Sequence, residues 1–156
     1  MFHLENERYR MKDIKVIGFD ADDTLWVNET YYRETENEFA KLMSEYLPED
    51  EVHKQLFSTE MQNLRMYGYG TKGFMLSLIE SAIKISKGEV SNDVLSEIIE
   101  MGKSMLQKPI ELLPGVQEVL EQLSDDYTLI VVTKGDLVNH MVYAYRYLAP
   151  LKQTQK

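Results

Sequence analysis

Two short apolar runs, separated by a long stretch of helical periodicity, dominate the hydrophobic pattern of the chain. The first run, Ile14 to Phe19, is rich in β-branched residues, which is typical of a strand buried on both faces of a parallel sheet. The second run, Leu129 to Val132, has the same character and ends at Thr133. Between the runs, apolar residues recur every three or four positions, which predicts helices. This order predicts an α/β protein with a helical insertion after its first strand.

Four helices are expected within the insertion. The first is predicted over 29–47, before Pro48, and the second over about 49–66. The glycine-rich stretch 67–73 predicts a helix–helix turn, because no strand precedes it as a phosphate-binding loop would require. A third helix should bury one apolar face, made of Met75, Leu78, Ile79, Ala82 and Ile83.

The fourth helix and the segments beyond it complete the predicted pattern. Ser91 is expected to cap the fourth helix. A shorter helix before the second strand carries an apolar stripe of Val116, Val119, Leu120 and Leu123. After Thr133, a turn at Lys134-Gly135-Asp136 should lead into a final helix over about 137–148.

Three carboxylates, Asp20, Asp22 and Asp23, directly follow the first strand. Open α/β sheets bind ligands at the carboxyl ends of their strands, and side chains two apart in extended chain point the same way. We therefore expect Asp20 and Asp22 to converge while Asp23 turns aside. Converging carboxylates require a cation or a shared proton, and oxygen-only ligands favour Mg²⁺. The structural alternative is an acidic loop that caps the helix beginning near Glu29.

The end of the second strand is a candidate phosphate site. A strand that ends in Thr and passes through a glycine-containing turn into a helix offers a hydroxyl and free backbone amides to an anion. Thr133 is the candidate ligand. Lys134 either adds positive charge there or is a solvated surface lysine.

The D-x-D-x-T-L pattern of Asp20, Asp22, Thr24 and Leu25, placed after a hydrophobic strand, resembles motif I of the haloacid dehalogenase-like hydrolases. Asp23 stands where that family more often has Gly. Thr133 resembles the phosphoryl-binding residue of motif II. The resemblance implies a partial Rossmann-like parallel-sheet core at 1–27 and 109–156, with an all-helical cap domain inserted at 28–108.

The resemblance also implies a function, a Mg²⁺-dependent phosphatase (a phosphoric monoester hydrolase) acting on a small phosphorylated metabolite. In that family Asp20 would attack phosphorus and form an aspartyl-phosphate, and Asp22 would act as general acid and base. Asp20 and the backbone carbonyl of Asp22 would hold Mg²⁺. Thr133, Lys134 and Thr24 would contact the phosphate.

After motif II, members of that family have further strands that supply a lysine, motif III, and an acidic pair, motif IV. No Asp or Glu follows Asp136, so we expect a truncated family member. The strand Ile14–Phe19 would then have an open apolar edge, through which copies of the chain could pair as a homo-oligomer. The alternative function is a catalytically impaired remnant that acts as a non-enzymatic binding or interaction module. A phosphoacceptor receiver domain fits less well, because it would need short alternating strands and helices.

The net charge and composition of the chain limit the classes of binding partner that we expect. The 156 residues carry a formal net charge of −9, which argues against nucleic acid and anionic membrane surfaces as partners. It does not argue against phosphorylated substrates, because bound Mg²⁺ can reverse the local field. There is no cysteine, and no apolar run reaches membrane-spanning length, so we expect a cytoplasmic protein.

Overall fold

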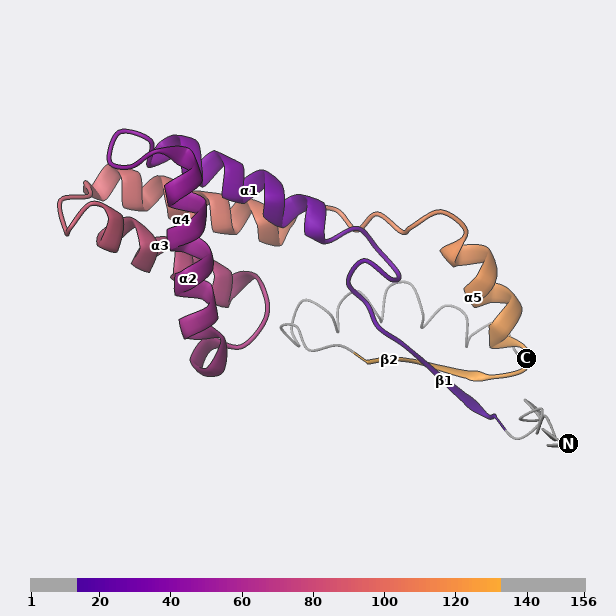
Figure 1. Cartoon of the computed structure of the whole chain (residues 1–156). Helices are drawn as coiled ribbons and strands as arrows, with labels where there is room; N and C mark the ends of the chain where they lie inside the picture. The colour runs from indigo at the N-terminus through magenta and orange to yellow at the C-terminus, as the bar shows by residue number, and fades with distance from the viewer. Residues whose placement is uncertain (1–13, 133–156) are drawn as a thin grey trace, which may run out of the picture.

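The computed structural model describes residues 14–132, which form a helical layer and a small sheet with one helix packed on it (Figure 1). The helical layer and the sheet are joined by two chain segments, 20–28 and 108–115. The elements in chain order are β1 (Val16–Phe19), α1 (Glu29–Leu42), α2 (Glu49–Tyr67), α3 (Thr71–Ile85), α4 (Asn92–Gln107), α5 (Val116–Ser124) and β2 (Thr128–Val131).

Helices α1 to α4 pack around one hydrophobic core. Its centre consists of side chains with little or no solvent exposure, including Phe39, Met43, Leu56, Leu78 and Ile98. Ser91 caps α4 as expected, since its hydroxyl accepts a hydrogen bond from the backbone N–H of Val94 at 3.2 Å. The helices are therefore held mainly by burial of their apolar faces, and at α4 a local hydrogen bond also fixes where the helix begins.

The glycine-rich stretch forms the turn between α2 and α3, as the sequence predicts. Gly68 and Gly70 have φ values of 72° and 120°, a region that side chains rarely enter. Gly73 lies within the first turn of α3, where an added Cβ would come within 3.1 Å of the carbonyl oxygen of Gly68. Small residues here let α3 return tightly against α2.

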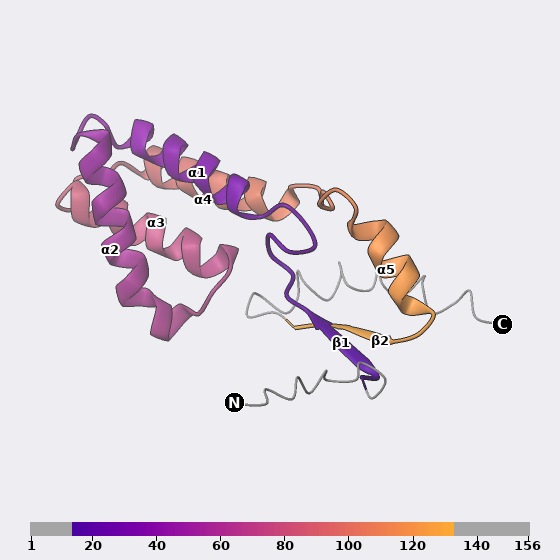
Figure 2. The ribbon, with the colours of Figure 1, turned by 45° about the vertical axis from the view of Figure 1, so that its right-hand side comes forward.

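The sheet pairs β1 with β2 in parallel, with Val16 opposite Thr128 and Phe19 opposite Val131. The backbone N–H of Val132 donates to the carbonyl of Phe19 at 2.7 Å, so the carboxyl ends of both strands lie side by side. Helix α5 covers one face, as both views show (Figure 2). A second, smaller core lies there, centred on Ala21, Leu25, Trp26 and Leu120.

The predicted burial of the first strand on both faces is wrong for the described part of the chain. Val16 is 51% exposed, and Gly18 is exposed as well, while Ile17 and Phe19 are half-buried. The physical reason is that α5 covers only one face of a two-stranded sheet, and nothing within residues 14–132 covers the other. The outer edge of β1 is also unpaired within that range.

Several helix details differ from the sequence prediction. Helix α1 ends at Leu42, five residues before the predicted end, and short turns continue to Tyr46. Ile83 is 44% exposed and Val119 is 47% exposed, although both were expected on buried faces. In α3, Leu78 and Ala82 are buried as predicted, and the buried face also includes Gly73 and Ser77, because tight contact with α2 favours small residues. The predicted helix at 137–148 lies outside the described residues.

Candidate active site

The loop after β1 is a tight turn built on a buried alanine. Ala21 has no solvent exposure, and its carbonyl accepts hydrogen bonds from the backbone N–H groups of Thr24 and Leu25 at 3.3 and 2.8 Å. The N–H of Asp23 in turn donates to the carbonyl of Trp26 at 2.9 Å. Within this turn the side chains of Asp22 and Asp23 have different hydrogen-bond partners.

Asp22 is held by an aromatic neighbour. The indole Nε1–H of Trp26 donates to Oδ1 of Asp22 over 3.2 Å, and the Trp26 ring is almost completely buried. A buried ring offers a fixed donor, so the Asp22 carboxylate is oriented by the hydrophobic core beneath it. Asp20, by contrast, is exposed at the end of β1.

Asp23 turns aside, as expected, and it also caps α1. Its Oδ1 accepts the backbone N–H of Asn28 at 2.9 Å, and both carboxylate oxygens lie within 3.1 Å of the N–H of Glu29. Its φ of 53° is in the left-handed region, which Asp tolerates better than most residues. The structural alternative, an acidic loop that caps this helix, is therefore correct for Asp23, which is one of the three carboxylates.

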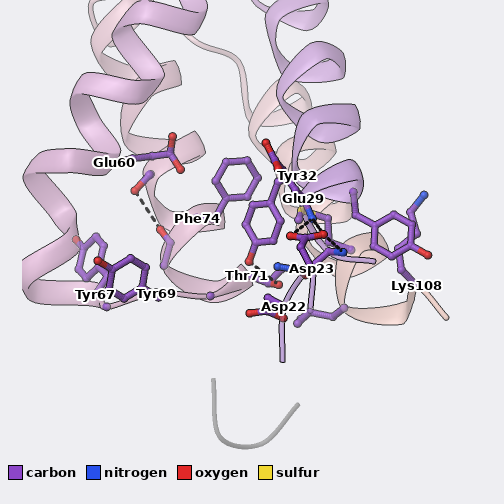
Figure 3. A pocket seen from close by; sticks show the side chains of 18 of the residues that line it. Asp22, Asp23, Glu29, Tyr32, Glu60, Tyr67, Tyr69, Thr71, Phe74 and Lys108 are labelled. Atoms are coloured by element: carbon purple, nitrogen blue, oxygen red, sulfur yellow. Dashed lines mark hydrogen bonds between the residues drawn. The ribbon is translucent and has the colours of Figure 1, made fainter. Parts of the chain in front are cut away.

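A cavity of about 440 Å³ lies between this loop and the helical layer. Asp22, Asp23 and Trp26 line it from the loop, and the other walls come from α1 to α4 and the segment after α4 (Figure 3). Its volume is within the range of small-molecule sites. Besides Trp26, five aromatic side chains line the walls: Tyr31, Tyr32, Tyr67, Tyr69 and Phe74.

The two segments that join the helical layer to the sheet are paired with each other by backbone hydrogen bonds beside this cavity. The N–H of Val27 donates to the carbonyl of Glu111 at 2.9 Å, and the N–H of Leu113 donates to that of Leu25 at 3.0 Å. The hydroxyl of Tyr31 donates to the Glu111 carboxylate at 3.0 Å, and burial together with this contact raises the pKa of Tyr31. These bonds fix the helical layer over the end of the sheet.

Glu60 is a cavity residue that the sequence analysis missed. Its carboxyl lines the cavity from α2, and burial together with the nearby Glu36 carboxylate raises its pKa to about 7. Leu56, Glu60 and Leu64 are spaced four apart, so Glu60 interrupts an inward-facing apolar stripe. That interruption was the available signal, because an acid on a buried stripe needs an explanation.

The other predicted site residues are not gathered at this cavity within the described chain. Asp20 does not line it. Thr24 lines a separate groove of about 260 Å³ beside α5, together with Phe19 and Val116. Thr133 and Lys134 lie outside the described residues. Their roles, and those of Asp20 and Thr24, stay predictions.

No group of three or more His, Asp or Glu side chains in residues 14–132 is placed to hold a metal ion. The metal-ligand roles expected for Asp20 and Asp22 stay predictions. Among the same residues, no helix is long and apolar enough to cross a membrane.

Comparison with solved structures identifies the fold. The chain is similar to a haloacid dehalogenase-like family hydrolase from Xanthomonas campestris, with a TM-score of 0.81 and 37% sequence identity over 88% of this chain. It spans 58% of the length of that protein. A predicted phosphoglycolate phosphatase from Haemophilus somnus is less similar, with a TM-score of 0.45 and 26% sequence identity. That match covers 79% of this chain and 52% of the other protein. No protein-family model and no curated protein matches the chain.

The D-x-D-x-T loop after a parallel strand, the helical layer above it and the similarity to the Xanthomonas structure agree with one another. The chain belongs to the haloacid dehalogenase-like hydrolase superfamily. The predicted fold class, a partial Rossmann-like parallel sheet with helices inserted after its first strand, is confirmed. The boundaries of the core at 1–27 and 109–156, and of the cap at 28–108, stay predictions.

Proposed function

We propose that the protein hydrolyses phosphomonoesters of small metabolites, with Asp20 as the nucleophile and Asp22 as the general acid and base. The observation that carries this proposal is the position of the D-x-D-x-T loop. It follows a parallel strand and opens, through Asp22, onto a cavity closed by helices. The 37% identity to a haloacid dehalogenase-like hydrolase supports the same chemistry.

In this mechanism a carboxylate oxygen of Asp20 attacks phosphorus, and the bond between phosphorus and the leaving oxygen breaks. Asp22 gives its proton to that oxygen, and the alcohol departs. Water then attacks the aspartyl-phosphate, Asp22 takes the proton of the water, and phosphate leaves with Asp20 regenerated. The hydrogen bond from Trp26 supports the role of Asp22, because it keeps the carboxylate oriented at the cavity.

The donor set of the loop fits Mg²⁺. This ion usually uses one or two carboxylates, with waters and phosphate oxygens completing its coordination. The Asp20 carboxylate and the backbone carbonyl of Asp22 would be its protein ligands. When bound, it would neutralise negative charge on the transferring phosphoryl group. Thr133 and Lys134, and less directly Thr24, are proposed to contact the phosphate.

Hydrolysis of a generic aryl phosphate, such as 4-nitrophenyl phosphate with Mg²⁺, tests the proposal. Asp20→Asn and Asp22→Asn should each lower turnover by at least about 100-fold, the usual size of losing a catalytic acid, base or nucleophile. Asp125→Asn is the matched control, because Asp125 is exposed at the end of α5 and should leave turnover unchanged. Equal turnover by Asp20→Asn and the parent chain would overturn the proposal.

A further inference from the structure

We propose that the cavity accepts phosphomonoesters whose leaving group is a ring-bearing alcohol, either neutral or positively charged. Leaving groups that carry a carboxylate are rejected. Glu60 is the specificity-determining residue. This inference rests on the proposed function for the phosphate end of the ligand. It concerns the other end, which must lie in the part of the cavity that the helices enclose.

The walls of this part of the cavity favour a flat, ring-bearing group. The rings of Tyr32 and Phe74 lie with centroids 4.9 Å apart at an interplanar angle of 55°, and the hydroxyl of Tyr32 is 3.3 Å from that of Thr71. In Figure 3 these rings lie between Glu60 and Asp22. Aromatic walls contribute most to affinity when a ring packs against them. The volume of about 440 Å³ leaves room for such a group beyond a phosphate.

The charges that line the cavity oppose an anionic leaving group. Lys108 is the only cationic side chain among the described lining residues, and it already pairs with another carboxylate. Its ammonium pairs with the Glu34 carboxylate at 3.1 Å and lies 5.1 Å from the centre of the Tyr31 ring. A carboxylate in the cavity would therefore lose water without gaining a cation from these residues, which is costly.

Glu60 supplies the attraction for the opposite kind of group. Within residues 14–132 we find no hydrogen-bond or ion-pair partner for its carboxyl, although the residue is half-buried. Burial, together with the Glu36 carboxylate, raises its pKa to about 7, as expected for a carboxylate without a cation among the described residues beside it. A ligand hydroxyl or ammonium beside it would compensate its charge. Asn63, the polar residue nearest in sequence on this wall, already donates to Ser77 at 3.1 Å.

The test uses three aryl phosphates of nearly equal shape: 4-(aminomethyl)phenyl phosphate, 4-(hydroxymethyl)phenyl phosphate and 4-carboxyphenyl phosphate. Calorimetry at pH 8 with the Asp20→Asn variant measures binding without requiring turnover. We expect the aminomethyl ligand to bind at least about tenfold more tightly than the carboxyphenyl ligand, with the hydroxymethyl ligand between them. Glu60→Gln, added to Asp20→Asn, should reduce that ratio to about threefold or less.

Glu97→Gln is the matched control, since Glu97 is exposed on α4 outside the cavity and removes the same charge. It should leave the ratio unchanged. A preference for the carboxyphenyl ligand, no binding by any of the three, or a ratio that Glu60→Gln leaves unaltered would each overturn the inference. Absence of hydrolysis by the parent chain, with this order of affinities intact, would count against the proposed function alone.

Discussion

The raised pKa of Glu60 makes a prediction about stability that does not depend on any ligand. In the unfolded chain this carboxyl ionises near pH 4.5, whereas in the folded protein it ionises near 7. Below pH 4.5 both states hold the proton, so Glu60 has no pH-dependent effect. As pH rises from 4.5 to about 7 the unfolded state loses its proton first, and the folded state is progressively destabilised.

The size of this effect follows from the shift and from the exposure of the group. A shift from 4.5 to about 7 would correspond to about 3 kcal/mol if the carboxyl were fully shielded. Since the side chain is only partly buried, solvent screening reduces the expected contribution to about 1–2 kcal/mol. Glu60→Gln removes the ionisation, so the variant should gain that much free energy of unfolding over the parent chain between pH 4.5 and pH 8.

Urea unfolding followed by circular dichroism, at intervals from pH 4.5 to pH 8, measures this difference. The Glu97→Gln control should differ from the parent by less than about 0.5 kcal/mol at every pH, because Glu97 is exposed. Glu36→Gln should reproduce part of the Glu60→Gln gain, because the Glu36 carboxylate contributes to the raised pKa of Glu60. A Glu60→Gln difference that stays flat or falls as pH rises would refute the reasoning.

Two further predictions concern the core and the loop. Phe39→Ala should lower the free energy of unfolding by about 3–5 kcal/mol, because Phe39 is fully buried between the helices. Phe57→Ala should change it by less than about 0.5 kcal/mol, since Phe57 is 62% exposed; equal losses in urea unfolding would contradict the packing described. Asp23→Gly should be more stable than Asp23→Ala by about 1 kcal/mol, because only Gly adopts the φ of 53° freely once the carboxylate is lost. Equal thermal stability of these two variants would count against a strained turn at Asp23.

Much of the fold follows from local patterns in the sequence. The parallel strands, the helix beginning after Ser91 and the turn at 67–73 were all predicted, because each depends on residues within one element or its cap. Burial was predicted less well. Ile83 and Val16 show why: the sequence pattern indicates an apolar face, but the neighbours that cover it are set by contacts distant in sequence.

In the candidate site, too, the parts that are local in sequence were predicted and the parts that combine distant segments were not. The D-x-D-x-T segment is contiguous, so its position at the end of β1 and the turning aside of Asp23 were predicted from the sequence. The cavity is lined by residues from four helices and two connecting segments. A local sequence pattern does not show that such distant segments lie together. Glu60 illustrates the limit: its position in an apolar stripe indicates an unusual acid, but the residues that surround it come from distant parts of the sequence.

Trapping the covalent intermediate tests the central claim most directly. The parent chain, incubated with ³²P-labelled phenyl phosphate and Mg²⁺ and quenched in acid, should carry acid-stable label that mass spectrometry assigns to Asp20. Asp20→Asn should carry none, whereas the exposed control Asp125→Asn should be labelled like the parent. Hydrolysis of the substrate with no label on the chain, or with the label on a residue other than Asp20, would contradict the account.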